Sequence, residues 1–69
     1  MNTTANQHIA TLLPRAQKHA DHYGVDWMIC TLDDGEETGW HIRPLSYATD
    51  PEFEAFNGVV EMVVEPRSK

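Results

Sequence analysis

Two alternating stretches of apolar residues flank an Asp-Gly pair, and this arrangement constrains the fold more than any other feature of the chain. The stretches are VDWMICTL, residues 25–32, and TGWHIR, residues 38–43, with Asp34-Gly35 between them. Both are rich in β-branched and aromatic residues, which favour strands. An Asp-Gly pair suits a type I′ turn, because both central residues of that turn need a positive φ. The sequence therefore predicts a β-hairpin.

A two-residue turn also predicts which side chains share a face of the hairpin. The pairs in that register are Trp27 with Ile42, Ile29 with Trp40, Thr31 with Thr38 and, on the opposite face, Asp26 with Arg43. Both tryptophans then lie on one apolar face, whereas a slip of one residue would break that face apart. A four-residue loop preserves the same facing, so the length of the loop is left open.

Residues 4–23 have the periodicity of an amphipathic helix. The apolar stripe consists of Ala5, Ile9, Leu12, Leu13, Ala16, Ala20 and Tyr23. Thr4 and Gln7 fit a capping box, and Gly24 fits a C-terminal cap. Pro14 removes a hydrogen bond inside this helix, so we expect either a kink at Pro14 or a helix that begins near Thr11.

A second helix and a third strand follow the hairpin. Asp50 is a suitable N-cap and Pro51 a suitable first residue for a short helix that runs to about Asn57. The stretch VVEMVVEP, residues 59–66, reads as a strand that ends at Pro66. In strict alternation, one face holds Val60, Met62 and Val64, and the other holds Val59, Glu61, Val63 and Glu65.

The order of these elements predicts a single small α+β domain over residues 1–69. Its architecture is a two-layer α-β-β-α-β arrangement, with the N-terminal helix packed on a small, mainly antiparallel three-stranded sheet. The helix covers the face with both tryptophans. The second face mixes apolar and charged residues, so we expect Phe53 and Phe56, or a second copy of the chain, to cover it.

That second face supplies the predicted interface. Its residues are Met28, Cys30, Leu32, His41, Tyr47, Phe53, Phe56, Val59, Glu61 and Val63. A chain of 69 residues has a small core, and its single cysteine allows no internal disulfide. Small domains of this kind often gain stability from a partner subunit. We therefore expect a homo-oligomer, most simply a homodimer.

The distribution of charge narrows the classes of partner. The chain has a formal net charge of −6, and residues 25–66 carry ten acidic side chains against Arg43 alone. A direct nucleic-acid binder should show a basic stripe, so the sequence argues against one and favours a basic protein partner. No stretch resembles a signal peptide or a bilayer-spanning segment. We expect a cytoplasmic protein with no membrane partner.

Three clusters could carry chemistry. The acidic patch of Asp33, Asp34, Glu36 and Glu37 lacks the spacing of a calcium loop and is read as a solvated hairpin tip. His8, Arg15, Lys18, His19 and His22 are assigned to the polar side of the first helix. His19 and His22 lack the further ligands of a structural zinc site. Cys30 and His41 share a sheet face as diagonal neighbours, but no third group is placed to orient the histidine.

The sequence thus predicts a non-enzymatic, protein-binding adaptor or inhibitor without a cofactor. Such proteins are typical of mobile elements in bacteria or phage. Its acidic residues, extended by Glu52, Glu54, Glu61 and Glu65, would face a basic partner. The alternative is a metal-dependent or Cys-His hydrolytic or redox protein that uses His19, His22, Cys30 and His41.

Overall fold

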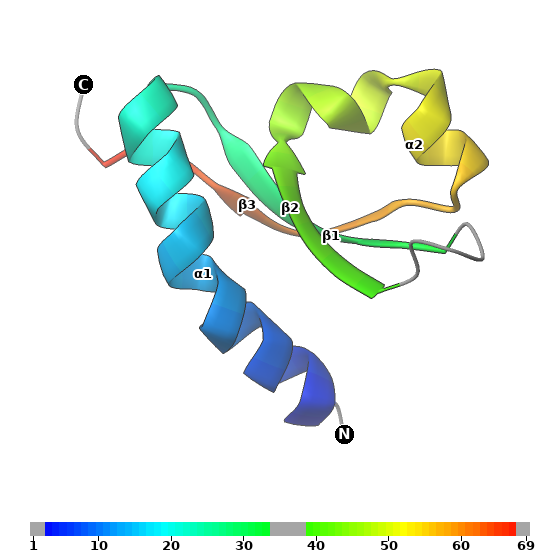
Figure 1. The fold of residues 1–69 in the computed structure, drawn as a ribbon, viewed down its shortest axis with the longest axis horizontal. Coiled ribbons are helices and arrows are strands. Elements are labelled where there is room, and N and C mark those ends of the chain that lie inside the picture. The colour runs from blue at the N-terminus through cyan, green and yellow to red at the C-terminus, as the bar shows by residue number, and fades with distance from the viewer. Residues whose placement is uncertain (1–2, 34–38, 68–69) are drawn as a thin grey trace.

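The computed structural model describes residues 3–33 and 39–67, with side chains from residue 6 onward. Along the chain, the elements are α1 (Thr3–Tyr23), β1 (Trp27–Leu32), β2 (Gly39–Pro44), the 3-10 helix η1 (Leu45–Thr49), α2 (Pro51–Ala55) and β3 (Val59–Val64). The sheet has the order β2-β1-β3, and both outer strands are antiparallel to β1. In Figure 1, helix α1 lies on the left, along one side of this sheet, and α2 lies on the right. The predicted α+β class is confirmed.

Helix α1 is continuous through Pro14, so it does not begin near Thr11. Gly24 ends it as predicted, with a φ of 70° and a hydrogen bond of 2.8 Å from its N–H to the carbonyl oxygen of Ala20. The predicted capping box involves the side chain of Thr4, which lies outside the described residues. No helix in the described ranges is long and apolar enough to cross a membrane.

The first core lies between α1 and the sheet. Ala16 and Ala20 are fully buried and let the helix backbone approach Ile29 of β1 and Val64 of β3. Partly buried side chains complete this cluster: Ile9, Leu12, Leu13, Trp27, Trp40 and Ile42. Both tryptophans therefore share the helix side of the sheet, as the facing of the hairpin predicted. Tyr23 departs from the predicted stripe, since it is 59% exposed.

The second core lies on the opposite side of the sheet and answers the question of what covers that face. Met28, Cys30, Leu32 and Phe53 are buried together. Around them pack Leu45, Tyr47, Ala48 and Phe56 from η1 and the region of α2. The cover is thus the chain's own η1–α2 segment, as the alternative with Phe53 and Phe56 predicted. The 3-10 helix was not foreseen.

The pairing between β1 and β2 differs from the predicted register by two residues. Trp27 lies opposite Pro44, Ile29 opposite Ile42, and Thr31 opposite Trp40. The predicted pair of Asp26 and Arg43 is wrong, because Arg43 lies opposite Met28. A shift of two residues keeps every side chain on its predicted face, since the period of a strand is two. The hydrophobic pattern could therefore determine the facing but not the partner of each residue.

A register shift interrupts the pairing of β1 with β3. Ile29 lies opposite Met62, but Cys30 lies opposite Val60, so Glu61 is an extra residue in β3. Such a bulge reverses the facing beyond it. Val59 and Val60 consequently take the faces opposite to those that strict alternation predicted. The Thr31 hydroxyl donates a hydrogen bond of 3.1 Å to Oε2 of Glu61.

The short helix α2 is capped as the sequence predicted. Asp50 accepts a hydrogen bond of 2.8 Å from the N–H of Glu52, and Pro51 takes the first helical position. The helix ends at Ala55, and Asn57 follows with a φ of 55°. The N–H of Gly58 then donates to the carbonyl oxygen of Phe53 at 2.8 Å. These local bonds hold Phe53 over the second core.

Candidate functional site

Strand β3 carries the largest exposed apolar surface of the sheet. Val59, Val60, Met62 and Val63 are 51%, 39%, 37% and 43% exposed, and Val64 is its one buried residue. The strand lies at an outer position, and no strand in the described part of the chain pairs with its outer side. Backbone donors and acceptors on such a side are available to another chain. We call residues Val59–Val63 the β3 edge.

The β3 edge is exposed because both covering layers lie over the centre of the sheet. Helix α1 buries Ile29 on one side, and the η1–α2 segment buries Met28 and Cys30 on the other. The bulge at Glu61 bends the strand and increases its twist. Glu61 and Glu65 add negative charge to this strand and to its end. Charges and bulges on an edge strand oppose indiscriminate pairing with other strands.

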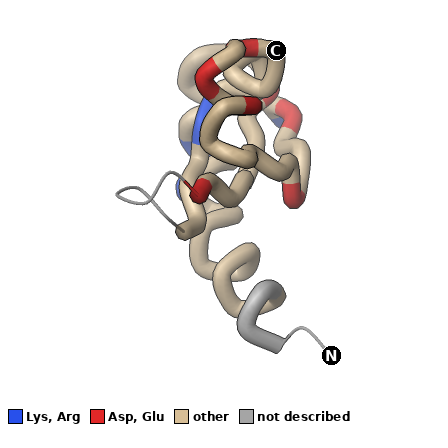
Figure 2. Tube along the Cα trace, turned by 90° about the vertical axis from the view of Figure 1, so that its right-hand side faces the viewer, with Lys and Arg blue, Asp and Glu red and all other residues tan. Residues whose placement is uncertain are grey.

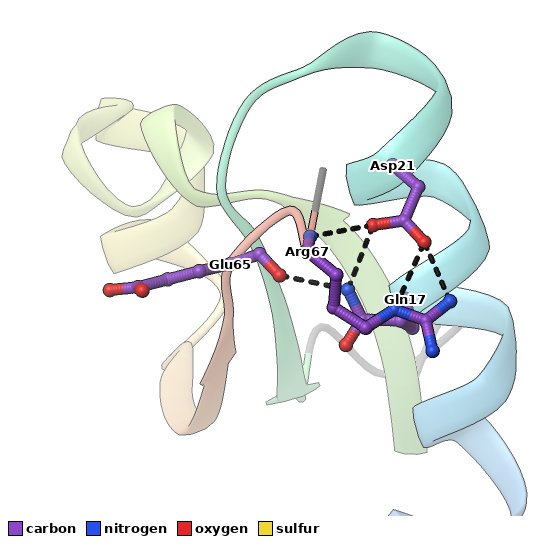
Figure 3. Close-up of polar contacts among 4 residues, drawn as sticks. All are labelled: Gln17, Asp21, Glu65 and Arg67. Carbon is purple, nitrogen blue, oxygen red and sulfur yellow. Dashed lines mark hydrogen bonds and ion pairs between the residues drawn. The ribbon is translucent and has the colours of Figure 1, made fainter. Parts of the chain in front are cut away.

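Polar contacts attach the segment after β3 to α1 (Figure 3). Asp21 Oδ1 accepts hydrogen bonds from the N–H of Arg67 at 2.8 Å and from Gln17 Nε2 at 3.0 Å. Asp21 Oδ2 accepts from Nη2 and Nε of Arg67 at 2.7 and 3.2 Å. Gln17 Nε2 also donates to the carbonyl oxygen of Glu65 at 2.8 Å. The backbone N–H and guanidinium of Arg67 hold the pKa of Asp21 below its ordinary value.

A groove of about 730 Å³ lies beside this contact, at the C-terminal half of α1. Its lining consists of Pro14, Arg15, Lys18, His19, Asp21, His22, Tyr23 and Arg67. We call it the basic groove. Three of the five Lys and Arg residues of the chain line it, although the chain as a whole is acidic. The predicted basic side of the first helix is thus present, and Arg67 joins it from the end of the chain.

Two histidines of α1 pack against the tryptophans of the sheet. The ring of His8 stacks on Trp40 at 5.1 Å, and the ring of His19 stacks on Trp27 at 4.6 Å. The two histidines are eleven positions apart, which is about three helical turns, so both rings lie along the same side of α1. They therefore border the core instead of lying on a purely solvated face. Nε1 of Trp27 is buried without a hydrogen-bond partner in the described structure.

The predicted interface residues fall into two groups. Met28, Cys30, Leu32 and Phe53 are buried in the second core, so they offer no surface, and this part of the prediction is corrected. The reason is that the η1–α2 segment covers them within one chain. His41, Tyr47 and Phe56 are half-buried, while Val59, Glu61 and Val63 are exposed on β3. These six remain a predicted interface.

Val60 and Met62 were missed as surface candidates because strict alternation placed them under the helix. Two signals in the sequence could have drawn attention to them. Val60 and Met62 flank Glu61, and a charge between apolar residues is compatible with an edge position. Three strands also require two edges, one of which β3 had to occupy if β1 was central.

The Cys30–His41 pair lacks the properties of a nucleophile and its base. The two residues lie directly opposite each other on β1 and β2 and not diagonally as predicted. Cys30 is fully buried, and burial raises the pKa of its thiol above the ordinary value, opposed by Arg43 and assisted by Glu61. A buried thiol with a raised pKa behaves as a small apolar side chain.

A metal site finds no support in the described geometry. Across residues 3–33 and 39–67, no group of three or more His, Cys, Asp and Glu side chains could hold an ion. His19 stacks on Trp27, and His22 meets the edge of Tyr23 at 4.7 Å. Of the acidic patch, Asp34, Glu36 and Glu37 lie outside the described residues. Asp33 is exposed, and its N–H donates to the carbonyl oxygen of Phe56 at 2.7 Å.

The charges are distributed unevenly over the molecule. In Figure 2, the part of α1 that follows its grey start carries no Lys, Arg, Asp or Glu, while acidic residues lie around the opposite end of the molecule. The positive charges of Arg15, Lys18 and Arg67 meet in the basic groove. The molecule therefore has two distinct surfaces, an acidic and apolar β3 edge and a basic groove along α1.

Comparison with known proteins found no matching family model, no matching curated protein and no matching solved structure. The functional argument accordingly depends on the geometry of this chain.

Proposed function

We propose that the protein is a small, non-enzymatic docking protein that binds an extended, basic segment of another protein along the β3 edge. The exposed apolar strand at the outer side of the sheet is the observation that carries this proposal. An added strand gains affinity from main-chain hydrogen bonds and specificity from alternate side chains. Val59, Val60, Met62 and Val63 would supply apolar contacts to that strand.

Charge favours a basic segment over a second copy of the chain. Two β3 strands side by side would bring Glu61 and Glu65 of both copies to one seam, in a protein whose net charge is already −6. Like charges opposite each other in a sheet are destabilising. A segment with Lys or Arg among β-branched residues would instead form opposite-charge pairs with these glutamates. The homo-oligomer stays a prediction that this proposal does not require.

A designed peptide tests the proposal directly. The probe is a fluorescent peptide of alternating Lys and Val, and the control is the same peptide with Glu in place of Lys. We expect saturable binding of the Lys peptide at micromolar to millimolar concentration, with backbone amide shifts concentrated in β3. Salt should weaken the binding within the usual screening range.

Charge reversal supplies the matched control. Glu65→Lys should weaken the binding of the Lys peptide and strengthen the binding of the Glu peptide, because it reverses a charge beside the β3 edge. Glu54→Lys makes the same change in charge on α2, outside the β3 strand, and should have a much smaller effect. Equal effects of the two variants, or no binding up to about 1 mM, would contradict the proposal.

A mass measurement tests whether a second copy of the chain, instead of a basic segment, binds at the β3 edge. Sedimentation equilibrium of the wild type, compared with the 7.8 kDa mass of one chain, shows whether copies associate at the concentrations of the peptide assay, and a dimer through another surface is compatible with the proposal. A dimer that Val63→Lys dissociates, together with absence of peptide binding, would assign the β3 edge to a second copy and overturn the proposal.

A further inference from the structure

The basic groove concentrates positive charge on an acidic protein. Among the described residues, Arg15, Lys18 and Arg67 line it against one carboxylate, Asp21, which gives a net charge of +2 with both histidines neutral. The carboxylate of Asp21 already accepts hydrogen bonds from Arg67 and Gln17. Arg15 and Lys18 have no hydrogen bond or ion pair with any described residue. Their charges are thus available to a ligand, and the ligand that complements them is an anion.

Aromatic rings form the other part of the lining. The ring centroids of Tyr23 and Trp27 are 5.7 Å apart, with an angle of 21° between the ring planes. The ring of His19 stacks on that of Trp27 with 4.6 Å between the centroids. Tyr23 nevertheless remains 59% exposed. An exposed ring that its neighbours hold in a fixed orientation can stack on a flat ligand ring at little cost in conformational entropy.

We propose that the basic groove binds a phosphomonoester carried by an aromatic ring, of which a mononucleotide is the simplest example. The guanidinium of Arg15 offers a forked pair of donors for the phosphate, and Lys18 adds a point charge. The ring of the ligand stacks on Tyr23, as bases do on exposed aromatic side chains. A groove of about 730 Å³ is within the range of small-molecule sites.

The distribution of charge on the protein favours a small ligand with one phosphate over a nucleic-acid chain. Salt screens charges beyond about 8–10 Å, so a single phosphate in the groove experiences mainly Arg15, Lys18 and Arg67. A polyanion would extend beyond the groove toward the ten acidic residues between positions 25 and 66. Binding of polyanions increases with the number of phosphates that basic residues neutralise, and this chain offers few such residues.

The test uses calorimetry and amide shifts with three probes: AMP, inorganic phosphate and adenosine. We expect AMP to bind most tightly, at least about fivefold more tightly than phosphate, with shifts in residues 14–23 and at Arg67. The double substitution of Arg15→Gln and Lys18→Gln should weaken the binding of AMP at least tenfold. Tyr23→Leu should reduce the affinity for AMP to that for phosphate, and it should leave the affinity for phosphate unchanged.

Arg43→Gln is the matched control, because it removes one arginine on the opposite side of the sheet. Its AMP affinity should equal that of the wild type. No saturable AMP binding up to about 10 mM would overturn the inference, as would equal weakening by Arg43→Gln and by the paired groove substitutions. If a single-stranded oligonucleotide binds more tightly than AMP, the inference of a small ligand is wrong and the groove is a nucleic-acid site. None of these results depends on the β3 edge.

Discussion

Single side chains make measurable contributions to this fold, and Tyr47 offers the clearest titration. Its hydroxyl donates a hydrogen bond of 2.8 Å to Oε1 of Glu52. That bond, together with burial and the negative charges of Glu52 and Asp50, raises the pKa of Tyr47 to about 12. Because the folded-state pKa lies above the ordinary value of 10.0, this bond stabilises the fold below pH 10.0 and loses its effect as pH rises to about 12.

We therefore expect an alkaline absorbance titration to show a tyrosine that ionises near pH 12. Glu52→Ala should move that transition toward 10.0, because it removes the acceptor. Tyr47→Phe isolates the signal from that of Tyr23. A transition near 12 that persists in Tyr47→Phe would contradict the assignment.

Among the described glycines, Gly58 has the least space for a side chain. A Cβ at this position would lie 2.5 Å from Cε1 and Cζ of Phe53, which is itself buried. We expect Gly58→Ala to lower the free energy of unfolding by about 1–3 kcal/mol, since the ring must move within a packed core. Denaturant unfolding measures this loss.

A double-mutant cycle identifies the cause. In a Phe53→Leu background the ring is absent, so Gly58→Ala should cost less there by about 1 kcal/mol or more. Gly24→Ala is a useful comparison, because Gly24 has open space around it but a φ of 70°. Its cost should be unaffected by Phe53→Leu.

At the scale of elements, the two helices use proline in opposite ways. Pro14 is inside α1 and deprives the carbonyl oxygen of Ala10 of its helical hydrogen bond. Pro51 is at the first position of α2, where no such bond is needed. The same substitution should therefore have opposite effects at the two sites.

We expect Pro14→Ala to raise the free energy of unfolding by about 2 kcal/mol, which is the helix penalty of about 3 kcal/mol less the effect of the entropy that Pro removes from the unfolded chain. Pro51→Ala should lower it by about 0.4–1 kcal/mol. Thermal unfolding followed by circular dichroism measures both. A fall in stability for Pro14→Ala would show that this proline is required by the packing of α1.

At the scale of the whole molecule, Asp21 and Arg67 connect the first helix to the end of the described chain. Arg67 lowers the pKa of Asp21 below 3.8, so folding favours the ionised carboxylate. The stabilisation is then present above pH 3.8 and is lost as pH falls through the folded-state pKa. Salt should weaken it, because the Arg67 side chain is largely exposed.

The measurement is the difference in unfolding free energy between the wild type and Asp21→Asn. We expect the wild type to be more stable at neutral pH and the difference to shrink below pH 3.8. Other carboxylates titrate in both proteins and cancel in the difference. A difference that stays constant through the acid range would contradict the role of this ion pair.

The sequence determined those features that depend on near neighbours. The alternation of the hairpin placed Trp27 and Trp40 on one face, and the local patterns around Gly24 and Asp50 identified how α1 ends and α2 begins. Periodicity and turn chemistry are short-range properties, so one chain segment is enough to show them. The presence of a basic side on α1 also followed from spacing alone.

Tertiary structure decided the rest. The pairing of each strand residue, the extra residue at Glu61, the outer position of β3 and the junction of Arg67 with Asp21 all join segments that are far apart in the chain. Their geometry depends on which arrangement lowers the free energy of the whole domain, and no local pattern contains that comparison. The candidate surfaces are of this kind: β3 is an edge because β1 occupies the centre, and Arg67 lines the basic groove because the segment after β3 returns to α1.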